Sequence, residues 1–397
     1  MAPTPPTPLH FRRAGFDPAP ELVEVRERDG VRRVDSPHLG RPVWLVTRIE
    51  EVREVLGDPG RFRNSERHLV PGAPALSDEE VAAIRPGNPL AFDPPEHTRL
   101  RRLLAPEFTA RRMRRLEPRV HEIVADHLDA IERKGPPADL VADFALPVPA
   151  LVICELLGVP FADRDEFQRR YTRFFDSTLS FEERVAIQFE SKAYLAELVA
   201  RAKVEPGDDL LGVLVRDESA GLEDRELVGL ADLLLLAGHE TTANMLGLGV
   251  LALLRHPEQL RLLRDEPERA AGAVEELLRW LTVVHTGVPR VTTTEVELGG
   301  QVIGAGELVV FSLPAANRDP ALLPDPDVLD ITRSASSHVA FGHGVHHCVG
   351  APLARIEMRI AFPALLRRFP SLRLAVAEPE FRVQQVVYGL ASLPVAW

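Results

Sequence analysis

Apolar residues recur at intervals of three and four along several stretches of the chain, which is the spacing of one face of an α-helix. From Leu116 this pattern predicts an amphipathic helix that ends at the sequence KGPP, residues 134–137. A second helix is expected at about 146–157. Residues 226–254 are apolar nearly all around the helix, which predicts a central helix enclosed by others.

The long apolar stretch must also be weighed as a membrane span, which needs ~20 predominantly apolar residues in a row. Polar residues interrupt its middle, so we expect it to be buried within the protein; they are His239, Glu240, Thr241, Thr242 and Asn244. The N-terminal sequence MAPTPPTPLHFRRAGFDP is rich in proline and has no apolar run. Neither a signal peptide nor a membrane anchor is therefore expected, and the predicted location is the cytoplasm.

Strand signals are few and lie late in the chain. In VELGGQVI, Gly299 and Gly300 separate two alternating runs, which predicts a hairpin with a tight primed turn. ELVVFSL at 307–313 predicts another strand, and RVQQVVYGLASLPV near the C-terminus predicts a further pair. Because no repeat, low-complexity segment or clear linker divides the chain, we expect one domain over residues 1–397, mainly α with small antiparallel β-sheets.

Length and composition restrict the class of protein. The chain has 397 residues, of which 45% are hydrophobic and 27% charged, as in globular proteins with a sizeable core. A formal net charge of −12 argues against a nucleic-acid partner. Arginine far outnumbers lysine, which occurs only at positions 134, 192 and 203, and this usage is typical of a GC-rich bacterial genome.

The two cysteines, Cys154 and Cys348, cannot form a disulfide framework and need separate explanations. Cys154 lies in the apolar helical sequence ALVICELLGVP, where a buried, inert thiol is expected. Cys348 lies in HVAFGHGVHHCVGAPLAR, residues 338–355, which also contains four histidines. Two of these, His338 and His343, are expected to be solvated loop residues.

Zinc binding and thiol catalysis are the first alternatives for this cysteine loop. Zinc sites usually draw ligands from spaced pairs, but His343, His346, His347 and Cys348 crowd into six residues with no second cluster elsewhere. A catalytic Cys-His pair is also conceivable, but the side chains of adjacent loop residues point apart, so His347 is a poor base for Cys348. Both alternatives explain little of the loop.

A single thiolate ligand to a large planar cofactor explains more of the loop. Its glycines would let the backbone run close beneath a flat ring and make the turns that present one sulfur; they are Gly342, Gly344 and Gly350. Pro352 predicts the first turn of a helix, so Cys348 lies at a helix N-terminus, where free amides and the helix dipole favour the thiolate. Phe341 is expected to shield the sulfur.

The pattern Phe341-Gly342-x-Gly344-x-His346-x-Cys348-x-Gly350 resembles the haem-binding loop of the cytochrome P-450 family of haem-thiolate monooxygenases. The resemblance implies haem b (iron protoporphyrin IX) as the cofactor, with Cys348 as the iron ligand. In this family the thiolate pushes electron density toward O–O cleavage. The resemblance also places the cofactor-binding residues of the loop at Phe341, Gly342, His346, Cys348 and Gly350.

The middle of the central helix, AGHETT, sets Ala237 and Gly238 one turn before Thr241 on the same face. A threonine in an apolar helix often bonds only to a carbonyl one turn earlier. A buried Glu240 is costly unless paired or hydrated, and such acids are often functional. The pattern resembles the family's acid-alcohol pair, which implies catalytic roles for Glu240 and Thr241 at the oxygen site and places Ala237 and Gly238 against the haem.

In DPPEHTRLRRLL, His97 and Arg101 are four residues apart on one helical face. They resemble the family's pair that binds the haem propionates, and Arg290 and His346 would add donors. Buried propionates need such charge-assisted partners. The whole run at 97–116 carries seven arginines and one acid, Glu107, a pattern usually typical of a solvated face. Because this helix resembles the one that lies across the haem on the cysteine side in the family, the resemblance implies a basic surface that steers an acidic ferredoxin.

The sequence EELLRW places Glu276 and Arg279 three apart, which alone is typical of a weak surface ion pair. Its position before the cysteine loop resembles the family's structural pair. Where many relatives read Pro-Glu-Arg-Phe, this chain has PDVL at 326–329, so Arg318 is our candidate for the third member of that network. Pro363, inside the helix after the cysteine, should cost ~3 kcal/mol or bend that helix.

The resemblance implies a monooxygenase that uses O2 and two electrons from a ferredoxin, which a ferredoxin reductase reduces with NADPH or NADH. The expected substrate is an apolar small molecule that is hydroxylated or epoxidised, such as a polyketide, macrolide or terpenoid of bacterial secondary metabolism. Segments that resemble the family's substrate contacts are the central helix and residues 69–92, 160–200, 283–289 and 388–394.

Two other functions are compatible with a haem-thiolate site. A haem-thiolate peroxygenase would take peroxide directly, but the intact Glu240-Thr241 pair argues against it. A non-enzymatic haem-binding protein would have no use for that pair. No nucleic-acid or membrane partner is expected.

Overall fold

The computed structural model describes residues 7–36, 41–64, 85–164, 166, 181–217, 219, 221–334, 337–382 and 387–397. Its α-helices are α1 (Pro20–Arg28), α2 (Ile49–Gly57), α4 (Glu96–Leu104), α5 (Ala110–Lys134), α6 (Pro147–Leu157), α8 (Phe181–Val204), α9 (Leu210–Arg216), α10 (Asp224–Arg255), α11 (Pro257–Asp265), α12 (Ala270–Leu281), α13 (Leu313–Asn317) and α14 (Ala351–Arg368). The three helices predicted from the apolar pattern are present as α5, α6 and α10, each within a few residues of its expected bounds except that α5 begins six residues earlier.

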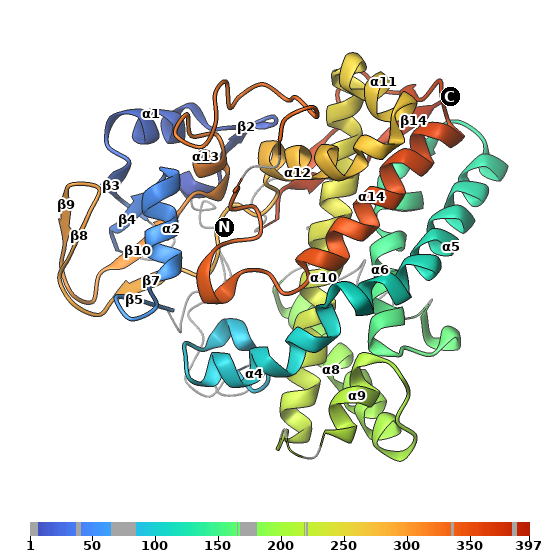
Figure 1. Cartoon of the computed structure of the whole chain (residues 1–397), viewed down its shortest axis with the longest axis horizontal. Coiled ribbons are helices and arrows are strands. Elements are labelled where there is room, and N and C mark those ends of the chain that lie inside the picture. Colours follow the sequence, from blue (N-terminus) through green and yellow to red (C-terminus); the bar gives the residue numbers. More distant parts are fainter. Residues whose placement is uncertain are drawn as a thin grey trace.

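Helix α10 runs through the middle of the molecule, with α6, α8, α12 and α14 packed against it (Figure 1). It begins at a capping box, in which Glu223 and Glu226 each accept a hydrogen bond from the other's backbone N–H. Every residue from Thr242 to Leu253 is buried, as expected for a helix enclosed on all sides. Across the described ranges, no helix is both long enough and apolar enough to cross a bilayer.

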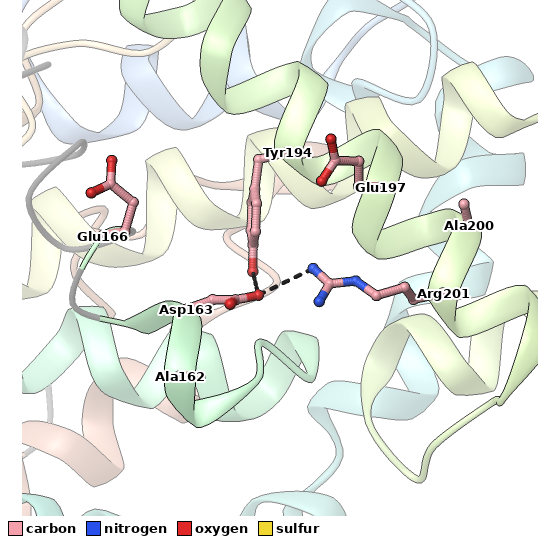
Figure 2. Close-up of a pocket in the computed structure, with 7 residues that line it drawn as sticks. All are labelled: Ala162, Asp163, Glu166, Tyr194, Glu197, Ala200 and Arg201. Carbon is pink, nitrogen blue, oxygen red and sulfur yellow. Dashed lines mark hydrogen bonds and ion pairs between the residues drawn. The ribbon is translucent and has the colours of Figure 1, made fainter.

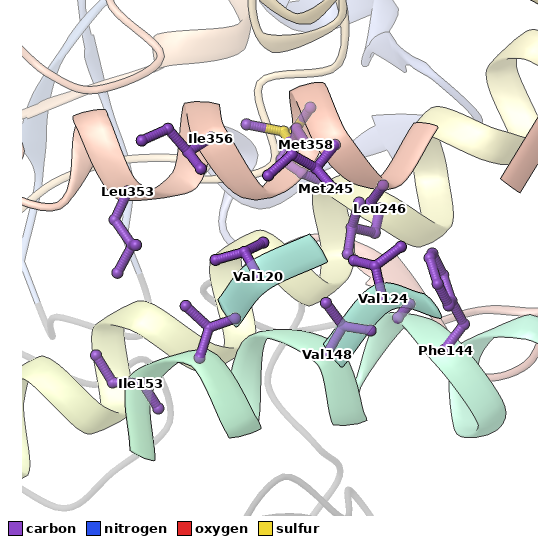
Figure 3. Packing of buried hydrophobic residues seen from close by; sticks show 14 of the residues in the cluster. Val120, Val124, Phe144, Val148, Ile153, Met245, Leu246, Leu353, Ile356 and Met358 are labelled. Atoms are coloured by element: carbon purple, nitrogen blue, oxygen red, sulfur yellow. The ribbon is translucent and has the colours of Figure 1, made fainter. Parts of the chain in front are cut away.

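The main core forms where α5, α6, α10 and α14 meet (Figure 3). Side chains at helical spacing on each of these elements interdigitate there. Burying such aliphatic side chains contributes roughly 1.5–3 kcal/mol each. Those labelled in Figure 3 on these four helices are Val120, Val124, Val148, Ile153, Met245, Leu246, Leu353, Ile356 and Met358. This core fixes α10 relative to the N-terminus of α14, the two places where the sequence predicts chemistry.

The strands are short, and they are β1 (Arg13–Ala14), β2 (Asp17–Pro18), β3 (Val31–Val34), β4 (Val43–Val46), β5 (Phe62–Asn64), β6 (Ala138–Asp139), β7 (Arg290–Thr292), β8 (Val296–Leu298), β9 (Gln301–Ile303), β10 (Leu308–Phe311), β11 (Arg373–Leu374), β12 (Phe381–Arg382), β13 (Gly389–Leu390) and β14 (Pro394–Ala396). The largest sheet has the order β3-β4-β10-β7-β5. The expectation that strands occur only late in the chain is wrong, because β1 to β5 precede residue 65.

One pairing also differs from the expected antiparallel arrangement, because β10 runs parallel to β4. The remaining named pairs are antiparallel. The predicted hairpin is confirmed as β8 and β9, and its turn residues Gly299 and Gly300 have φ of 55° and 74°. Positive φ at both central residues is the requirement of a type I′ turn.

Pro363 lies inside α14, which continues through it to Arg368. Pro118 likewise lies inside a helix, α5, which continues through it to Lys134. The tertiary packing of both helices therefore outweighs the lost backbone hydrogen bond. The single-domain boundary at residues 1–397 stays a prediction.

Candidate active site

The cysteine loop turns tightly before α14 because two of its glycines adopt backbone conformations that other residues avoid. Gly342 and Gly344 have φ of 73° and 68°. A Cβ atom on Gly344 would lie 2.4 Å from the carbonyl oxygen of Leu56 in α2, so this position excludes a side chain on two grounds. The backbone N–H of Cys348 donates to the carbonyl of Phe341 over 2.9 Å and closes the loop.

Cys348 lies just before the N-terminus of α14, as predicted. Desolvation raises the pKa of its thiol, while the backbone N–H groups of Gly350 and Ala351 and the charges of Arg101 and Arg355 lower it. The two backbone N–H groups act in the predicted direction, toward the thiolate. A coordinated metal ion is the kind of charge that deprotonates a thiol outright.

A network of side chains around Glu275 connects the cysteine loop to helices α12 and α14. The carboxylate of Glu275 on α12 accepts hydrogen bonds from Arg355 over 2.6 and 2.9 Å and lies 3.2 Å from Nε2 of His338. Although desolvation raises the pKa of Glu275, these partners hold it at about 2. His338 is therefore not the solvated residue that the sequence predicted, since only 3% of its side chain is exposed. His343 is exposed as expected.

Four predicted donors form one group, which we call the basic cluster: His97 and Arg101 on α4, Arg290 on β7 and His346 in the loop. The rings of His97 and His346 are 4.2 Å apart. Nε2 of His346 lies 3.2 Å from the side-chain amide of Asn64. Arg101 donates to the carbonyl of His347, which links α4 to the residue before the cysteine.

The basic cluster contains buried nitrogens and positive charges that no acidic side chain balances within the cluster. Nδ1 of His97 and Nη1 of Arg290 are buried without a hydrogen-bond partner in the part of the chain that the structure describes. Burial lowers the pKa of Arg290 to about 10. Burial and the charges of Arg290, His97 and Arg101 lower the pKa of His346 to about 3. Buried donors without partners are costly, so the cluster is built to receive an anionic group.

A small cavity of about 80 Å³ adjoins the basic cluster. Its walls come from α2, β5, the segment before β7, β10 and the cysteine loop. The lining residues are Leu56, Asn64, Leu90, Gly287, Val288, Arg290, Phe311, Leu313, Gly342, His343 and His346. Three of the predicted cofactor-binding residues therefore share one cavity wall.

On α10, the Thr241 hydroxyl donates to the carbonyl of Ala237 over 2.7 Å, which is the helix back-bond that the sequence left open as an alternative. Ala237 is exposed and Gly238 half-buried. Burial raises the pKa of Glu240 to about 7, although the charge of Arg382 acts in the opposite direction. Its carboxylate oxygen Oε1 lies 3.6 Å from Arg382. The acid is thus poised near neutral pH.

Arg382 on β12 was missed by the sequence reasoning. It lies 142 positions from Glu240 in a segment whose residues carry no recognisable motif. Its guanidinium donates to the side-chain oxygen of Asn244 over 2.6 Å, and the amide of Asn244 donates to the carbonyl of Glu240 over 2.9 Å. These contacts tie the C-terminal hairpin to the acid on α10.

Glu276 and Arg279 form a buried pair with two hydrogen bonds of 2.7 Å, and the side chains are 4% and 0% exposed. The third member is Arg333, whose Nε lies 3.5 Å from Glu276. The prediction of Arg318 is wrong. Arg318 instead donates to the carbonyl of Trp280 and to Asp327.

The structure therefore joins the predicted residues into two groups. The basic cluster and Cys348 are linked through Arg101 and the cysteine loop, whereas Glu240 and Thr241 lie on α10. Among the described residues, no hydrogen bond or ion pair connects the two groups directly.

A separate pocket of about 650 Å³ lies between η5 (Phe161–Asp163) and α8 (Figure 2). Tyr194 and Arg201 point toward Asp163, which accepts hydrogen bonds from both over 2.9 and 3.1 Å. The pocket falls in the segment 160–200 that was expected to contact substrate. Residues 165 and 167–180 of that segment, and residues 69–84 of the earlier one, lie outside the described part of the chain.

Comparison with solved structures defines the class of protein. The structure of StaH, a P450 from the biosynthesis of the glycopeptide antibiotic A47934, matches with a TM-score of 0.88 at 48% identity, over 99% of this chain and 100% of that one. The fold class predicted from the sequence, the cytochrome P-450 fold, is therefore confirmed.

The chain belongs to the cytochrome P450 family. It is 48% identical over 400 residues to cytochrome P450 FAS1 of Rhodococcoides fascians, with both chains fully covered. It is 45% identical over 389 residues to mycinamicin IV hydroxylase/epoxidase of Micromonospora griseorubida, with 96% of each chain covered. The family model described as "Cytochrome P450" matches residues 201–388. The predicted enzyme class, a P450 monooxygenase, is thereby confirmed.

Members of this family bind haem b, which confirms the predicted cofactor. The residues present suit this group. Haem carries two carboxylates, and the basic cluster offers buried nitrogens of His97 and Arg290 that lack partners among the described residues. Cys348, at the entry to α14, would hold the iron through its sulfur, the kind of ligand that this family uses.

Proposed function

We propose that this enzyme takes two electrons from a ferredoxin and uses O2 to hydroxylate or epoxidise an apolar small molecule of bacterial secondary metabolism. The observation that carries the proposal is the combination of the basic cluster beside the cysteine loop with a buried acid of near-neutral pKa on α10. The first suits an anionic haem, and the second suits proton transfer. A haem carrier would need only the first.

Four residues would hold the two propionates: His97, Arg101, Arg290 and His346. Cys348 would ligate the iron. The small side chains of Ala237, Gly342 and Gly350 would leave room for the flat ring, and Phe341 would shield the sulfur. Gly238 instead gives room to Ile153 of α6, because a Cβ atom there would lie 3.1 Å from Cδ1 of Ile153. When bound, the haem supplies the oxygen-activating chemistry of the reaction.

Glu240 and Thr241 would manage protons on the α10 side. A carboxyl whose pKa lies near the working pH can both release and regain a proton at Oε1, as a general acid-base group requires. The Thr241 hydroxyl keeps its oxygen lone pairs available while its hydrogen lies on the carbonyl of Ala237. Rotation of that hydroxyl would let it donate into the oxygen site and return to its back-bond afterwards.

The electron donor would dock on four exposed arginines of α4 and α5, Arg102, Arg111, Arg114 and Arg115, which we call the arginine face. In the described structure these four make no ion pair, so their charge is available to an acidic partner. The other arginines of the run are engaged. Arg99 pairs with Glu96 and Glu226, and Arg112 pairs with the buried Glu107 over 2.9 Å.

The proposed substrate class rests on the relatives and on the chain's apolar candidate contacts. The relatives named above include a hydroxylase/epoxidase of mycinamicin IV and a P450 of antibiotic biosynthesis. In the candidate segment 283–289, Gly287 and Val288 line the small cavity beside the basic cluster. A polyketide, macrolide or terpenoid skeleton suits such walls. The cytoplasmic location stays a prediction.

Turnover with different electron sources tests the proposal. The haem-loaded enzyme is given a panel of apolar natural products that shift its ferric spectrum, with NADPH, ferredoxin and reductase in one series and peroxide alone in another. We expect product mainly in the first series. Product only with peroxide would indicate a peroxygenase, and no product in either series, despite spectral binding, would indicate a haem-binding protein without this activity.

A further inference from the structure

The contacts of Arg382 point to a role that the haem-binding residues do not share. Its Nη2 atom lies 3.6 Å from Oε1 of Glu240 and donates to Oδ1 of Asn244 over 2.6 Å. The Arg382 and Glu240 side chains are 14% and 12% exposed, so solvent screens this pair little. We propose that Arg382 is a positioning residue, which keeps a positive charge beside the Glu240 carboxylate and sets how readily that group takes up a proton.

The fold is built to bring Arg382 to this point. Arg382 on β12 pairs in register with Gly389 on β13. A Cβ atom on Gly389 would lie 1.6 Å from Oδ1 of Asn244, so a side chain there would push the hairpin away from α10. The glycine therefore permits the close approach on which the contact between Arg382 and Asn244 depends.

The pair is close without being hydrogen-bonded. Across the described ranges, Oε1 of Glu240 and Nε of Arg382 are both buried without a hydrogen-bond partner, although the two charged groups are within ion-pair distance. Arg382 is thus an electrostatic neighbour that leaves the acid's oxygen available. A full two-bond contact would instead fix the carboxylate in its ionised form.

The other titratable group beside Glu240 is uncharged. His239, its neighbour on α10, lies with Nε2 3.0 Å from the carbonyl of Leu146. Burial lowers its pKa to about 4, although the bond to Leu146 acts in the opposite direction. On the described parts of the elements packed against α10, Arg382 is the charged group that acts on Glu240. Burial and Arg382 therefore oppose each other at this acid, and the balance leaves its pKa at about 7.

The inference deepens the proposed function, because it rests on Glu240 as the residue that handles the proton. An opposite charge this close typically lowers a carboxyl pKa by about 1–3 units. In Arg382→Gln the titration midpoint of Glu240 should therefore rise by about one pH unit or more. At pH 7 the ratio of ionised to protonated Glu240 would fall about tenfold.

Infrared spectroscopy of the haem-loaded enzyme, labelled with ¹³C-glutamate, measures this midpoint directly. The carboxyl band of Glu240 is assigned by its loss in Glu240→Gln and followed against pH. Arg382→Lys keeps the charge and should restore most of the parent midpoint. Arg373→Gln makes the same charge change at an exposed position on β11 and should leave the midpoint unchanged.

The pH profile of product formed per NADPH provides the second readout. If Arg382→Gln raises the midpoint and shifts this profile to higher pH by the same amount, both the inference and the proposed role of Glu240 are supported. An unchanged midpoint in Arg382→Gln overturns the inference. A raised midpoint with an unchanged profile supports the inference and instead contradicts the role of Glu240 in proton delivery.

Asn244→Ala keeps the test decisive if Arg382→Gln loses its haem. This variant keeps the arginine but removes the side-chain oxygen that anchors it. We expect a rise in the Glu240 midpoint smaller than one unit, because the freed guanidinium spends part of its time farther from the acid. An unchanged midpoint there would contradict the positioning role.

Discussion

Replacing Arg279 with alanine should cost far more stability than any surface ion pair contributes. The guanidinium makes two hydrogen bonds of 2.7 Å to Glu276 and donates to the carbonyls of Asn317 and Pro326 over 3.0 and 2.7 Å. Its side chain is fully buried. Truncation would leave the buried Glu276 carboxylate with Arg333 at 3.5 Å as its nearest cation.

The expected loss follows from these contacts. Removing one partner of a buried ion pair typically destabilises a protein by about 3–5 kcal/mol, because the remaining charge stays desolvated. Arg333 offsets part of this loss, so we expect about 3 kcal/mol. Arg269→Ala is the matched control, because Arg269 has the same three-residue spacing to Glu266 but both side chains are about 40% exposed. That pair should contribute less than about 1 kcal/mol.

Urea unfolding of the haem-loaded proteins, followed by far-ultraviolet circular dichroism, measures both free energies. A double-mutant cycle then identifies the third member of the network. Substitutions of Glu276 and Arg333 should be coupled, whereas substitutions of Glu276 and Arg318 should add independently. Equal losses in Arg279→Ala and Arg269→Ala would refute the reasoning.

Two further predictions concern the reaction. Thr241→Ala should keep haem and substrate binding but form less product and more peroxide per NADPH, and unchanged coupling would show that the hydroxyl is only the back-bond to Ala237. Reversing Arg102, Arg111 and Arg115 to glutamate should slow reduction by ferredoxin severalfold or more at low ionic strength, with less effect at high salt, and should spare peroxide-driven turnover. Reduction at the parent rate with the parent salt dependence would place the donor elsewhere.

Local patterns in the sequence were enough to predict α5, α6, α10 and the β8–β9 hairpin, but the 24-residue helix α8 was not predicted. An apolar periodicity or a pair of glycines is a signal contained in a short stretch of sequence. Both α10 and the turn at Gly299 and Gly300 follow from such signals. The strands before residue 65 were missed because each has at most four residues. One of them, β4, pairs with β10 more than 260 positions later. No local pattern encodes such a partner.

The same contrast between local signals and long-range packing holds for the candidate active site. The resemblance to the family's motifs singled out the residues of the basic cluster and of α10, but it could not show which arginine turns toward which acid. Arg318 and Arg333 lie on either side of residues 326–329, and only tertiary packing directs Arg333 to Glu276. Arg382 reaches Glu240 through a hairpin near the far end of the chain.

The most direct test of the account is the ligand to the iron. The reduced carbon monoxide complex of the parent enzyme should show the red-shifted Soret band of a haem-thiolate protein. Cys348→Ser should lose this band, because a serine hydroxyl stays protonated where a coordinated thiol is ionised. Cys154→Ser serves as the control and should keep the band, since Cys154 is buried in α6 and burial raises its thiol pKa to about 12. An unchanged band in Cys348→Ser would contradict the assignment of Cys348 and the site built around it.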